Sequence, residues 1–292
     1  MPAQAPLTGI LRHLREEPSR TWSVIITLYG DAIVPRGGSV WLGTLVGFFE
    51  ALDIGQGVVR TAMSRLAADG WLERSRVGRN SFYHLAGKGR ETFRQATQHI
   101  YNAQPRPWSG RFELLLLGGI REREEARSAL ALAGFGPAAP GVWIAPGDTA
   151  IPPEAAEAIR LDAGCDLETA RALTSRAWDL GQTANGYRRF LELFEPLAAA
   201  LNGRAPMSDL DAFVVRILLI HAYRRVILRD PILPPKLLPA DWPGATARGL
   251  CATLYHRLLP ASERWLDEHG QNERGKLPPA GPELRSRFQQ RR

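Results

Sequence analysis

Residues 54–85, IGQGVVRTAMSRLAADGWLERSRVGRNSFYHL, carry a helix pattern that runs directly into a hairpin pattern rich in arginine. In the first half, apolar residues recur in pairs every four positions, which predicts the buried face of an amphipathic helix. These residues are Val58, Val59, Ala62, Met63, Leu66 and Ala67. Asp69 and Gly70 are residue types that commonly end a helix. The stretch therefore predicts a helix of about four turns followed at once by two strands.

The opposite face of this predicted helix is polar, with Arg60, Thr61, Ser64 and Arg65. Guanidinium and hydroxyl groups on one helix face can reach phosphates and base edges when the helix lies in the major groove of DNA. We therefore expect this helix to be a DNA-recognition element.

Two short strands are predicted next, over Trp71–Arg74 and Ser81–Leu85. Gly78 gives the connection the freedom that a tight turn needs. The polar residues at the tip are Arg76, Arg79 and Asn80. We expect these side chains to contact the sugar–phosphate backbone, as the tip of a wing does.

The alternative is a solvated helix followed by an ordinary hairpin. Arginine supplies nearly all the positive charge, because the only lysines are Lys88, Lys236 and Lys276, so arginine content alone says little. The DNA interpretation is favoured by three features that coincide: the polar helix face, the immediate hairpin and the charged tip.

The residues upstream complete a small module. Trp22–Tyr29 predicts a first buried helix that breaks at Gly30, Ser39–Trp41 predicts a strand that pairs with the hairpin, and Leu42–Leu52 predicts a second helix. Gly55 is an acceptable N-cap for the third helix. This order is typical of a winged helix-turn-helix, and we assign it to residues 20–103.

Length and composition allow further domains and restrict the class of protein. The chain has 292 residues, 45% of them apolar, which predicts two or three globular domains. Its two cysteines, Cys165 and Cys251, lie far apart, which argues against a disulfide scaffold or a cysteine-based zinc site. The N-terminus lacks a signal-peptide pattern, and no apolar run approaches the ~18 residues of a membrane span. We expect a cytoplasmic protein that does not associate with membranes.

Positive charge is concentrated at the two ends of the chain. Residues 1–100 hold 12 basic and 8 acidic residues, residues 101–270 hold 19 and 20, and residues 271–292 hold 6 and 2. An excess of positive charge over the predicted helix and hairpin is what binding to DNA requires.

The next region predicts a small α+β domain over residues 108–174. The elements expected there alternate: a strand over 112–117, a helix over 121–133, a strand over 141–146, a helix that begins over 153–159, and a closing strand or turn near 166–173. Such an alternation favours a ferredoxin-like fold.

The remainder is predicted to be helical from residue 175 to 269, interrupted by the proline-rich segment RDPILPPKLLPADWPG over 229–244. Residues 270–292 are polar and rich in proline and arginine, and we expect a flexible tail there, either inert or weakly attracted to DNA. The predicted architecture is thus α+β, with an N-terminal winged helix-turn-helix, a central ferredoxin-like domain and a C-terminal helical domain, to which the family resemblance described next assigns effector binding and dimerisation.

Three segments together carry a family resemblance: LYGDAIVPRGGSVWLGTL (28–45), VVRTAMSRLAADGWLERSRVGRNSFYHL (58–85) and YRRVILRDPILPPKLLPADWPG (223–244). The chain resembles PaaX-type transcriptional regulators, the repressors of phenylacetic acid catabolism. The resemblance implies a homodimer that binds double-stranded operator DNA and releases it when an aryl-CoA thioester, typically phenylacetyl-CoA, binds outside the DNA-reading domain. It also implies a central domain similar to a small CRISPR-associated endonuclease. One departure from the family pattern is that the recognition helix opens with Gly55, Gln56 and Gly57.

A CoA thioester needs cations for its phosphates and an aromatic or apolar pocket for its acyl group. The C-terminal half offers such residues in three places: Trp178, Tyr187 with Arg188 and Arg189, and Tyr223 with Arg224 and Arg225. The alternative is that these arginines form salt bridges with partners such as Asp179, Glu192 or Asp230.

An enzyme is the less favoured interpretation. A metal-dependent nuclease in the central domain would need a carboxylate near the end of its first strand, where the sequence has Leu117 and Gly118. Histidines show no metal-ligand spacing, and His221, within the apolar run ILLIHAY, is interpreted as a core residue. We therefore assign no catalytic residue, no metal ligand and no cofactor.

Overall fold

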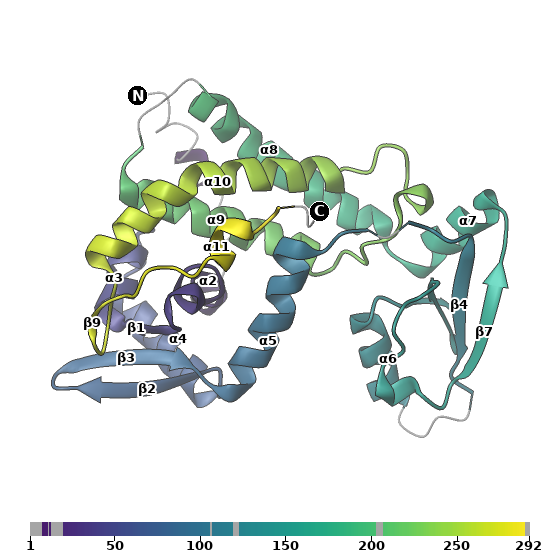
Figure 1. The fold of residues 1–292 in the computed structure, drawn as a ribbon, viewed down its shortest axis with the longest axis horizontal. Helices are drawn as coiled ribbons and strands as arrows, with labels where there is room; N and C mark the ends of the chain where they lie inside the picture. Colours follow the sequence, from purple (N-terminus) through teal and green to yellow (C-terminus); the bar gives the residue numbers. More distant parts are fainter. Residues whose placement is uncertain are drawn as a thin grey trace. The chain divides into compact units, whose positions relative to one another are not determined.

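The computed structural model describes residues 8–10, 12, 20–105, 107–118, 123–202 and 207–289. Helices and antiparallel sheets are both present, so the α+β class predicted from the sequence is confirmed (Figure 1). Contacts divide the chain into two compact units. The first unit comprises the described parts of Met1–Asn102, Tyr187–Leu228 and Ala245–Arg292, and the second comprises those of Ala103–Gly186 and Arg229–Gly244.

The N-terminal part of the first unit is a set of short helices around a three-stranded antiparallel sheet. Its elements are α2 (Thr21–Leu28), β1 (Ser39–Trp41), α3 (Leu42–Glu50), α4 (Gln56–Ala68), β2 (Leu72–Val77), β3 (Asn80–Leu85) and α5 (Gly87–Thr97). The strand order is β1-β3-β2, and Val40 lies opposite Tyr83, which confirms the predicted pairing of residues 39–41 with the hairpin.

The α-helix ends at Leu28, next to the break predicted at Gly30, but the helical path of the chain does not end there. The chain continues from α2 through a π-helical turn, Tyr29–Ile33, and a 3-10 turn, Val34–Arg36. It changes direction only at Gly37 and Gly38, both of which have positive φ. The π-helical turn places Asp31 in a buried polar network. The partners of Asp31 lie far along the chain, so local helix propensity does not reveal this role.

Helices from the C-terminal half of the chain pack in the same unit. They are α8 (Leu180–Asn202), which enters this unit at Tyr187, α9 (Asp209–Ile227) and α10 (Gly244–His269). α9 is apolar along nearly its whole length, so it is buried on all sides. The ring of Phe213 on α9 lies 5.2 Å from that of Phe48 on α3 and 4.8 Å from that of Trp265 on α10. α9 therefore joins the N-terminal elements and α10 in one core.

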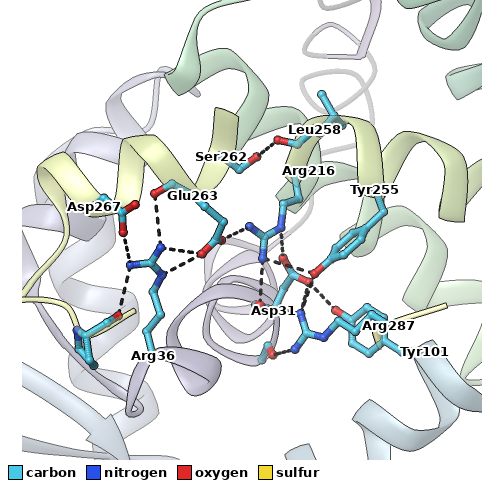
Figure 2. A network of polar contacts seen from close by, with 12 residues as sticks. Asp31, Arg36, Tyr101, Arg216, Tyr255, Leu258, Ser262, Glu263, Asp267 and Arg287 are labelled. Atoms are coloured by element: carbon cyan, nitrogen blue, oxygen red, sulfur yellow. Dashed lines mark hydrogen bonds and ion pairs between the residues drawn. The ribbon is translucent and has the colours of Figure 1, made fainter. Parts of the chain in front are cut away.

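A buried polar network links the N-terminal elements to α9 and α10 (Figure 2). At its centre, Asp31 pairs with Arg216 of α9 at 2.7 Å and with Arg287 at 2.7 Å, and it accepts a hydrogen bond from Tyr101 at 2.6 Å. Arg216 continues to Glu263 of α10 at 2.5 Å. Because each charge has an opposite charge beside it, the cost of burying these groups is offset.

The network extends toward the end of α10 through Arg36. The guanidinium of Arg36 lies 2.6 Å from Glu263 and 2.8 Å from Asp267. Arg36, Arg216 and Arg287 thus face three carboxylates, and the side chains of all three arginines are at most 5% exposed.

The prediction of a flexible tail from residue 270 is wrong for the described residues 270–289. This C-terminal segment contains β8 (Gln271–Asn272), β9 (Gly275–Lys276) and α11 (Glu283–Ser286). Its buried side chains are Leu277, Leu284, Arg287 and Phe288. Composition suggested disorder, but Arg287 of this segment pairs with the distant Asp31, and the few apolar residues of the segment are buried in the core of the first unit.

The second unit is built on a four-stranded antiparallel sheet. Its elements are β4 (Arg111–Leu116), α6 (Arg123–Leu132), β5 (Gly136–Ala139), β6 (Val142–Pro146), β7 (Ile159–Gly164) and α7 (Leu167–Ala177). The strand order is β5-β6-β4-β7. One face of β4 enters a core cluster with Leu115 and Leu130 of α6, and the other enters a cluster with Phe112 and Ala170 of α7.

Three sequence predictions for this unit are corrected. The segment 153–159, expected to start a helix, forms only a 3-10 turn, Pro153–Ala155, and Ile159 already begins β7. The segment 166–173 is the start of α7, because the side chain of Asp166 caps the helix by accepting a hydrogen bond from the Thr169 amide at 2.9 Å. Strand β5 was not predicted. The expected helix over 121–133 is confirmed from Arg123, and residues 119–122 lie outside the described part.

The contacts group the segments differently from the order along the chain. Residues 229–244, with their 3-10 turn Pro235–Leu237, belong to the second unit, whereas α9 and α10 on either side belong to the first. The separate domains over 20–103, 108–174 and 175–269 stay a prediction. Of the helices described, none has the length and apolar character that crossing a membrane requires.

Candidate nucleic-acid interface

Helix α4 presents an exposed polar face above a narrow buried stripe. Val59, Met63 and Leu66 are buried. Val58 was predicted to share that face, but it is 53% exposed because it lies about 100° around the helix from its neighbour. Gly55 occupies the N-cap position in an extended conformation, with no side-chain cap, as the sequence suggested.

The hairpin beside α4 has longer strands and a tighter turn than the sequence predicted. In the observed register Arg76 lies opposite Ser81, and Val77 lies opposite Asn80. The connection is therefore only Gly78 and Arg79, with Gly78 at φ +59°. This places Arg76 and Asn80 at the ends of the strands, where the sheet ladder holds their positions.

A hollow of about 600 Å³ opens between α4 and the hairpin. We call it the arginine groove. Its lining residues are Trp41, Leu42, Gly43, Gln56, Arg60, Ser64, Arg74, Arg76, Gly78, Arg79, Asn80, Ser81 and Tyr83. The lining contains four arginines and no acidic residue. None of these arginines pairs with a carboxylate of the described residues, so their donors are available to an anionic ligand.

Most of the predicted DNA-contacting residues meet in this groove. Arg60 and Ser64 come from α4, and Arg76, Arg79 and Asn80 come from the hairpin. The other two lie outside its lining. The hydroxyl of Thr61 donates to the carbonyl of Gly57 at 2.9 Å, and the guanidinium of Arg65 lies 4.0 Å from Asp69.

Sequence reasoning missed Arg74, Gln56 and Tyr83. The guanidinium of Arg74 donates to the hydroxyl of Ser81 at 2.6 Å and lies 5.9 Å from the ring centroid of Tyr83. The signal was available, because Arg74 and Arg76 are two positions apart and a strand places such residues on one face. An arginine held over an aromatic ring is oriented before any ligand arrives.

The carboxylate of Glu273 contacts the hairpin sheet outside the arginine groove. Glu273 of the C-terminal segment accepts hydrogen bonds from Ser39 of β1 at 2.7 Å and from Ser75 of β2 at 2.8 Å. Desolvation opposes ionisation of Glu273, but these hydrogen bonds outweigh it, and the pKa of Glu273 is lowered. The carboxylate therefore stays charged and ties two strands of the hairpin sheet to the end of the chain.

The residues predicted for the effector do not form one cluster. Tyr187 and Tyr223 are buried in the first unit, whereas Trp178 belongs to the second unit and packs against Gly136. Arg224 is half-buried and donates to the carbonyl and hydroxyl of Ser23. Three of the predicted residues have exposed side chains: Arg188, Arg189 and Arg225.

Two carboxylates on the sheet of the second unit form ion pairs with arginines. Glu113 of β4 pairs with Arg160 of β7, and Asp162 of β7 lies 2.7 Å from Arg111 of β4. Across the described residues, no group of three or more His, Cys, Asp or Glu is arranged to hold a metal ion. His221, interpreted as a core residue, is buried, with its Nδ1 2.9 Å from the hydroxyl of Thr27.

Comparison with known proteins gives matches to two family models over separate parts of the chain. Residues 20–89 match the family model for PaaX-like protein, and residues 178–268 match that for the PaaX-like protein C-terminal domain. The chain is 38% identical to "Transcriptional repressor PaaX" of Escherichia coli (strain K12), over 96% of this chain and 94% of that protein.

Among solved structures, the fold is similar to that of "Uncharacterized protein Rv0674 from Mycobacterium tuberculosis". The TM-score is 0.52 at 26% sequence identity, and the match covers 75% of this chain and 88% of the other.

Proposed function

We propose a function for this chain from the premise that it belongs to the PaaX-like protein family. It is a DNA-binding transcriptional repressor of phenylacetate-type catabolic genes rather than an enzyme. The observation that carries the proposal is the arginine groove, because four guanidiniums without carboxylate partners, set between a helix and a hairpin, match the negative charge of a DNA backbone.

In this proposal the N-terminal elements act as a winged helix-turn-helix. α4 enters the major groove with Arg60 and Ser64 directed at base edges, because Arg donates in pairs to guanine and hydroxyls accept or donate to several bases. The hairpin lies along the backbone, where Arg74, Arg76 and Arg79 contact phosphates. The support is the order of α3, α4, β2 and β3 and the exposure of these side chains.

In this proposal, the protein leaves its DNA when a second ligand binds. A homodimer presents two α4 helices about one DNA turn apart, and an aryl-CoA thioester such as phenylacetyl-CoA favours a dimer geometry in which this spacing fails. The second unit takes the role of a ferredoxin-like domain, which its antiparallel order β5-β6-β4-β7 supports.

The test is a gel-shift titration of the purified protein with the DNA upstream of its own gene, at fixed salt, with and without phenylacetyl-CoA. The proposal predicts specific binding that phenylacetyl-CoA weakens and that free phenylacetate or CoA does not. Equal affinity for the upstream DNA and for random DNA of the same length would contradict it. A divalent-cation-dependent loss of full-length DNA would indicate a nuclease instead.

A further inference from the structure

The end of the described chain delivers an aromatic ring into an aromatic pocket of the first unit. The side chain of Phe288 is 7% exposed. Its ring centroid lies 5.2 Å from that of Tyr101, 5.4 Å from that of Tyr255 and 6.0 Å from that of Tyr223. The backbone of Phe288 has φ +62°, a conformation that non-glycine residues adopt at a cost. The segment thus accepts backbone strain in order to place a benzyl group among three tyrosines.

Two arginines beside this pocket retain donors without acceptors. Arg248 of α10 lies 5.5 Å from the Phe288 ring centroid and donates from Nη2 to the carbonyl of Tyr101. Arg224 of α9 donates from Nη2 to Ser23. The Arg248 Nη1 and the Arg224 Nε are buried and have no hydrogen-bond partner among the described residues.

The charges of these two arginines are also not balanced locally. Within the described chain, neither guanidinium forms a salt bridge with a carboxylate, in contrast to Arg287 beside them, which pairs with Asp31. Burial lowers the pKa of Arg224, and Tyr101 acts in the opposite direction. A buried donor without an acceptor costs free energy, and a ligand oxygen that accepts a hydrogen bond from it would remove that cost.

We propose that the pocket formed by Tyr101, Tyr223 and Tyr255 is the site for the aromatic end of the effector, with Arg224 and Arg248 donating to the thioester carbonyl of the same ligand, and that Phe288 occupies this site in the free protein. The ligand class is an arylacetyl thioester, in which one methylene separates the ring from a carbonyl acceptor. The benzyl side chain of Phe288 has the same ring and methylene as a phenylacetyl group. This inference rests on the proposed release of DNA by an aryl-CoA thioester, and it identifies the pocket to which the thioester binds.

Displacement of Phe288 would reach the DNA-binding elements through the C-terminal segment. The Gly281 amide donates to the carbonyl of Pro35 at 2.9 Å. Nearer the start of the segment, Glu273 binds Ser39 and Ser75 on the strands that carry the hairpin. A ligand that expels Phe288 therefore competes with a segment whose other contacts hold β1 and β2 in place, which couples the two sites.

The test measures binding of phenylacetyl-CoA to the full-length protein by isothermal titration calorimetry. Phe288→Ala removes the resident ring, so we expect it to bind phenylacetyl-CoA about tenfold more tightly than the wild type. Arg248→Met should bind about tenfold more weakly, and Arg248→Lys should recover part of that loss. Arg264→Met, on an exposed face of the same helix α10, is the matched control and should bind as the wild type does.

A second measurement needs no variant and covers the case in which Phe288→Ala folds poorly. Hydrogen exchange of the wild-type protein should become faster at the Leu277 and Gly281 amides when phenylacetyl-CoA is added, since both donate to backbone carbonyls in the free protein. Unchanged exchange there, or slower exchange, would overturn the displacement of this segment.

The outcomes separate this inference from the proposed function. If phenylacetyl-CoA binds the wild type and releases DNA, but Arg248→Met binds it as tightly as the wild type does, the proposed pocket is wrong and phenylacetyl-CoA is still the effector. If the protein binds its upstream DNA specifically but does not bind phenylacetyl-CoA, both the proposed pocket and the proposed effector are wrong. The assignment as a DNA-binding repressor is then unaffected.

Discussion

Arginine has opposite roles in two regions of the first unit. In the arginine groove, Arg60, Arg74, Arg76 and Arg79 are exposed, and none of them pairs with a carboxylate in the described part of the chain. In the buried network, Arg36, Arg216 and Arg287 are each paired with acids (Figure 2). The comparison teaches that arginine content does not identify a DNA-binding surface. Whether each guanidinium has a carboxylate partner does, because an unpaired exposed cation is available to phosphate and a paired buried one is not.

The largest expected effect comes from breaking the network at its centre. Asp31→Asn leaves Arg216 and Arg287 buried beside a neutral group, so we expect it to lower the free energy of unfolding by about 3–5 kcal/mol. Urea unfolding followed by circular dichroism measures this loss. The control is Asp209→Asn, which removes an exposed pair with Arg264 and should cost less than about 1 kcal/mol. Equal costs for the two variants would contradict the distinction between buried and exposed pairs.

Next in size is a pH effect at the contact between α2 and α9. Burial, with Arg224 and Arg225 nearby, lowers the pKa of His221 from 6.5 to about 3. The unfolded chain therefore takes up a proton below pH 6.5 that the folded protein does not. The contribution to stability is fully present above pH 6.5 and is lost as the pH falls toward 3.

This loss amounts to about 2 kcal/mol between pH 7 and pH 5, and urea unfolding at the two pH values measures it. In His221→Gln, which has no titrating imidazole, the difference between the two pH values should shrink by about that amount. A wild-type protein that is as stable at pH 5 as at pH 7, with the variant unchanged, would show that His221 is not held neutral.

The groove itself is tested by two substitutions with different expected signatures. Arg60→Ala should cost about 1–3 kcal/mol on the specific site and much less on random DNA, because α4 is assigned to base edges. Arg79→Ala should weaken binding to both by similar factors and reduce the salt slope by about 0.9. Fluorescence anisotropy at several salt concentrations gives both quantities. Identical losses on specific and random DNA for Arg60→Ala would remove its base-reading role.

The smallest effect is expected outside the groove. Arg65 is exposed, lies 4.0 Å from Asp69 and does not line the groove. Arg65→Ala should therefore change specific binding less than Arg60→Ala does, and stability by at most about 0.5 kcal/mol. A loss of specificity as large as that of Arg60→Ala, in the same anisotropy assay, would extend the reading face to the end of α4.

The sequence predicted what local pattern controls. The period of the apolar residues placed α4, the proline-rich segment 229–244 separated the helical stretches on either side of it, and the pattern of residues 81–85 placed β3. It did not predict what depends on partners far along the chain. Asp31 and Arg287 are separated by 256 positions, so nothing near Arg287 indicated that residues 270–289 would be ordered. Strand β5 was missed because GPAA carries little strand propensity and is held by its pairing with β6.

The candidate site shows the same difference between features that a local pattern predicts and features that depend on distant residues. Arg76, Arg79 and Asn80 were found because they surround a glycine turn, and Arg60 and Ser64 because they lie on a polar helix face. Arg74 was predicted to lie in a strand but was given no role in binding. Its position in the groove depends on two contacts between distant residues: the pairing of Arg74 with Tyr83, and the packing of α4 beside the hairpin. The predicted effector residues are dispersed because the boundary between the two units separates Trp178 from Tyr187 and Tyr223, which the order of residues does not reveal.

The central claim is that the three hairpin arginines of the groove, Arg74, Arg76 and Arg79, bind the DNA backbone. Its most direct test is the slope of log affinity against log salt concentration for the wild type and for a variant with Arg74, Arg76 and Arg79 all changed to alanine. Each lost phosphate contact reduces the slope by about 0.9, so the account predicts a reduction of about 2.7, with an unfolding midpoint close to that of the wild type. An unchanged slope in a folded variant would contradict it.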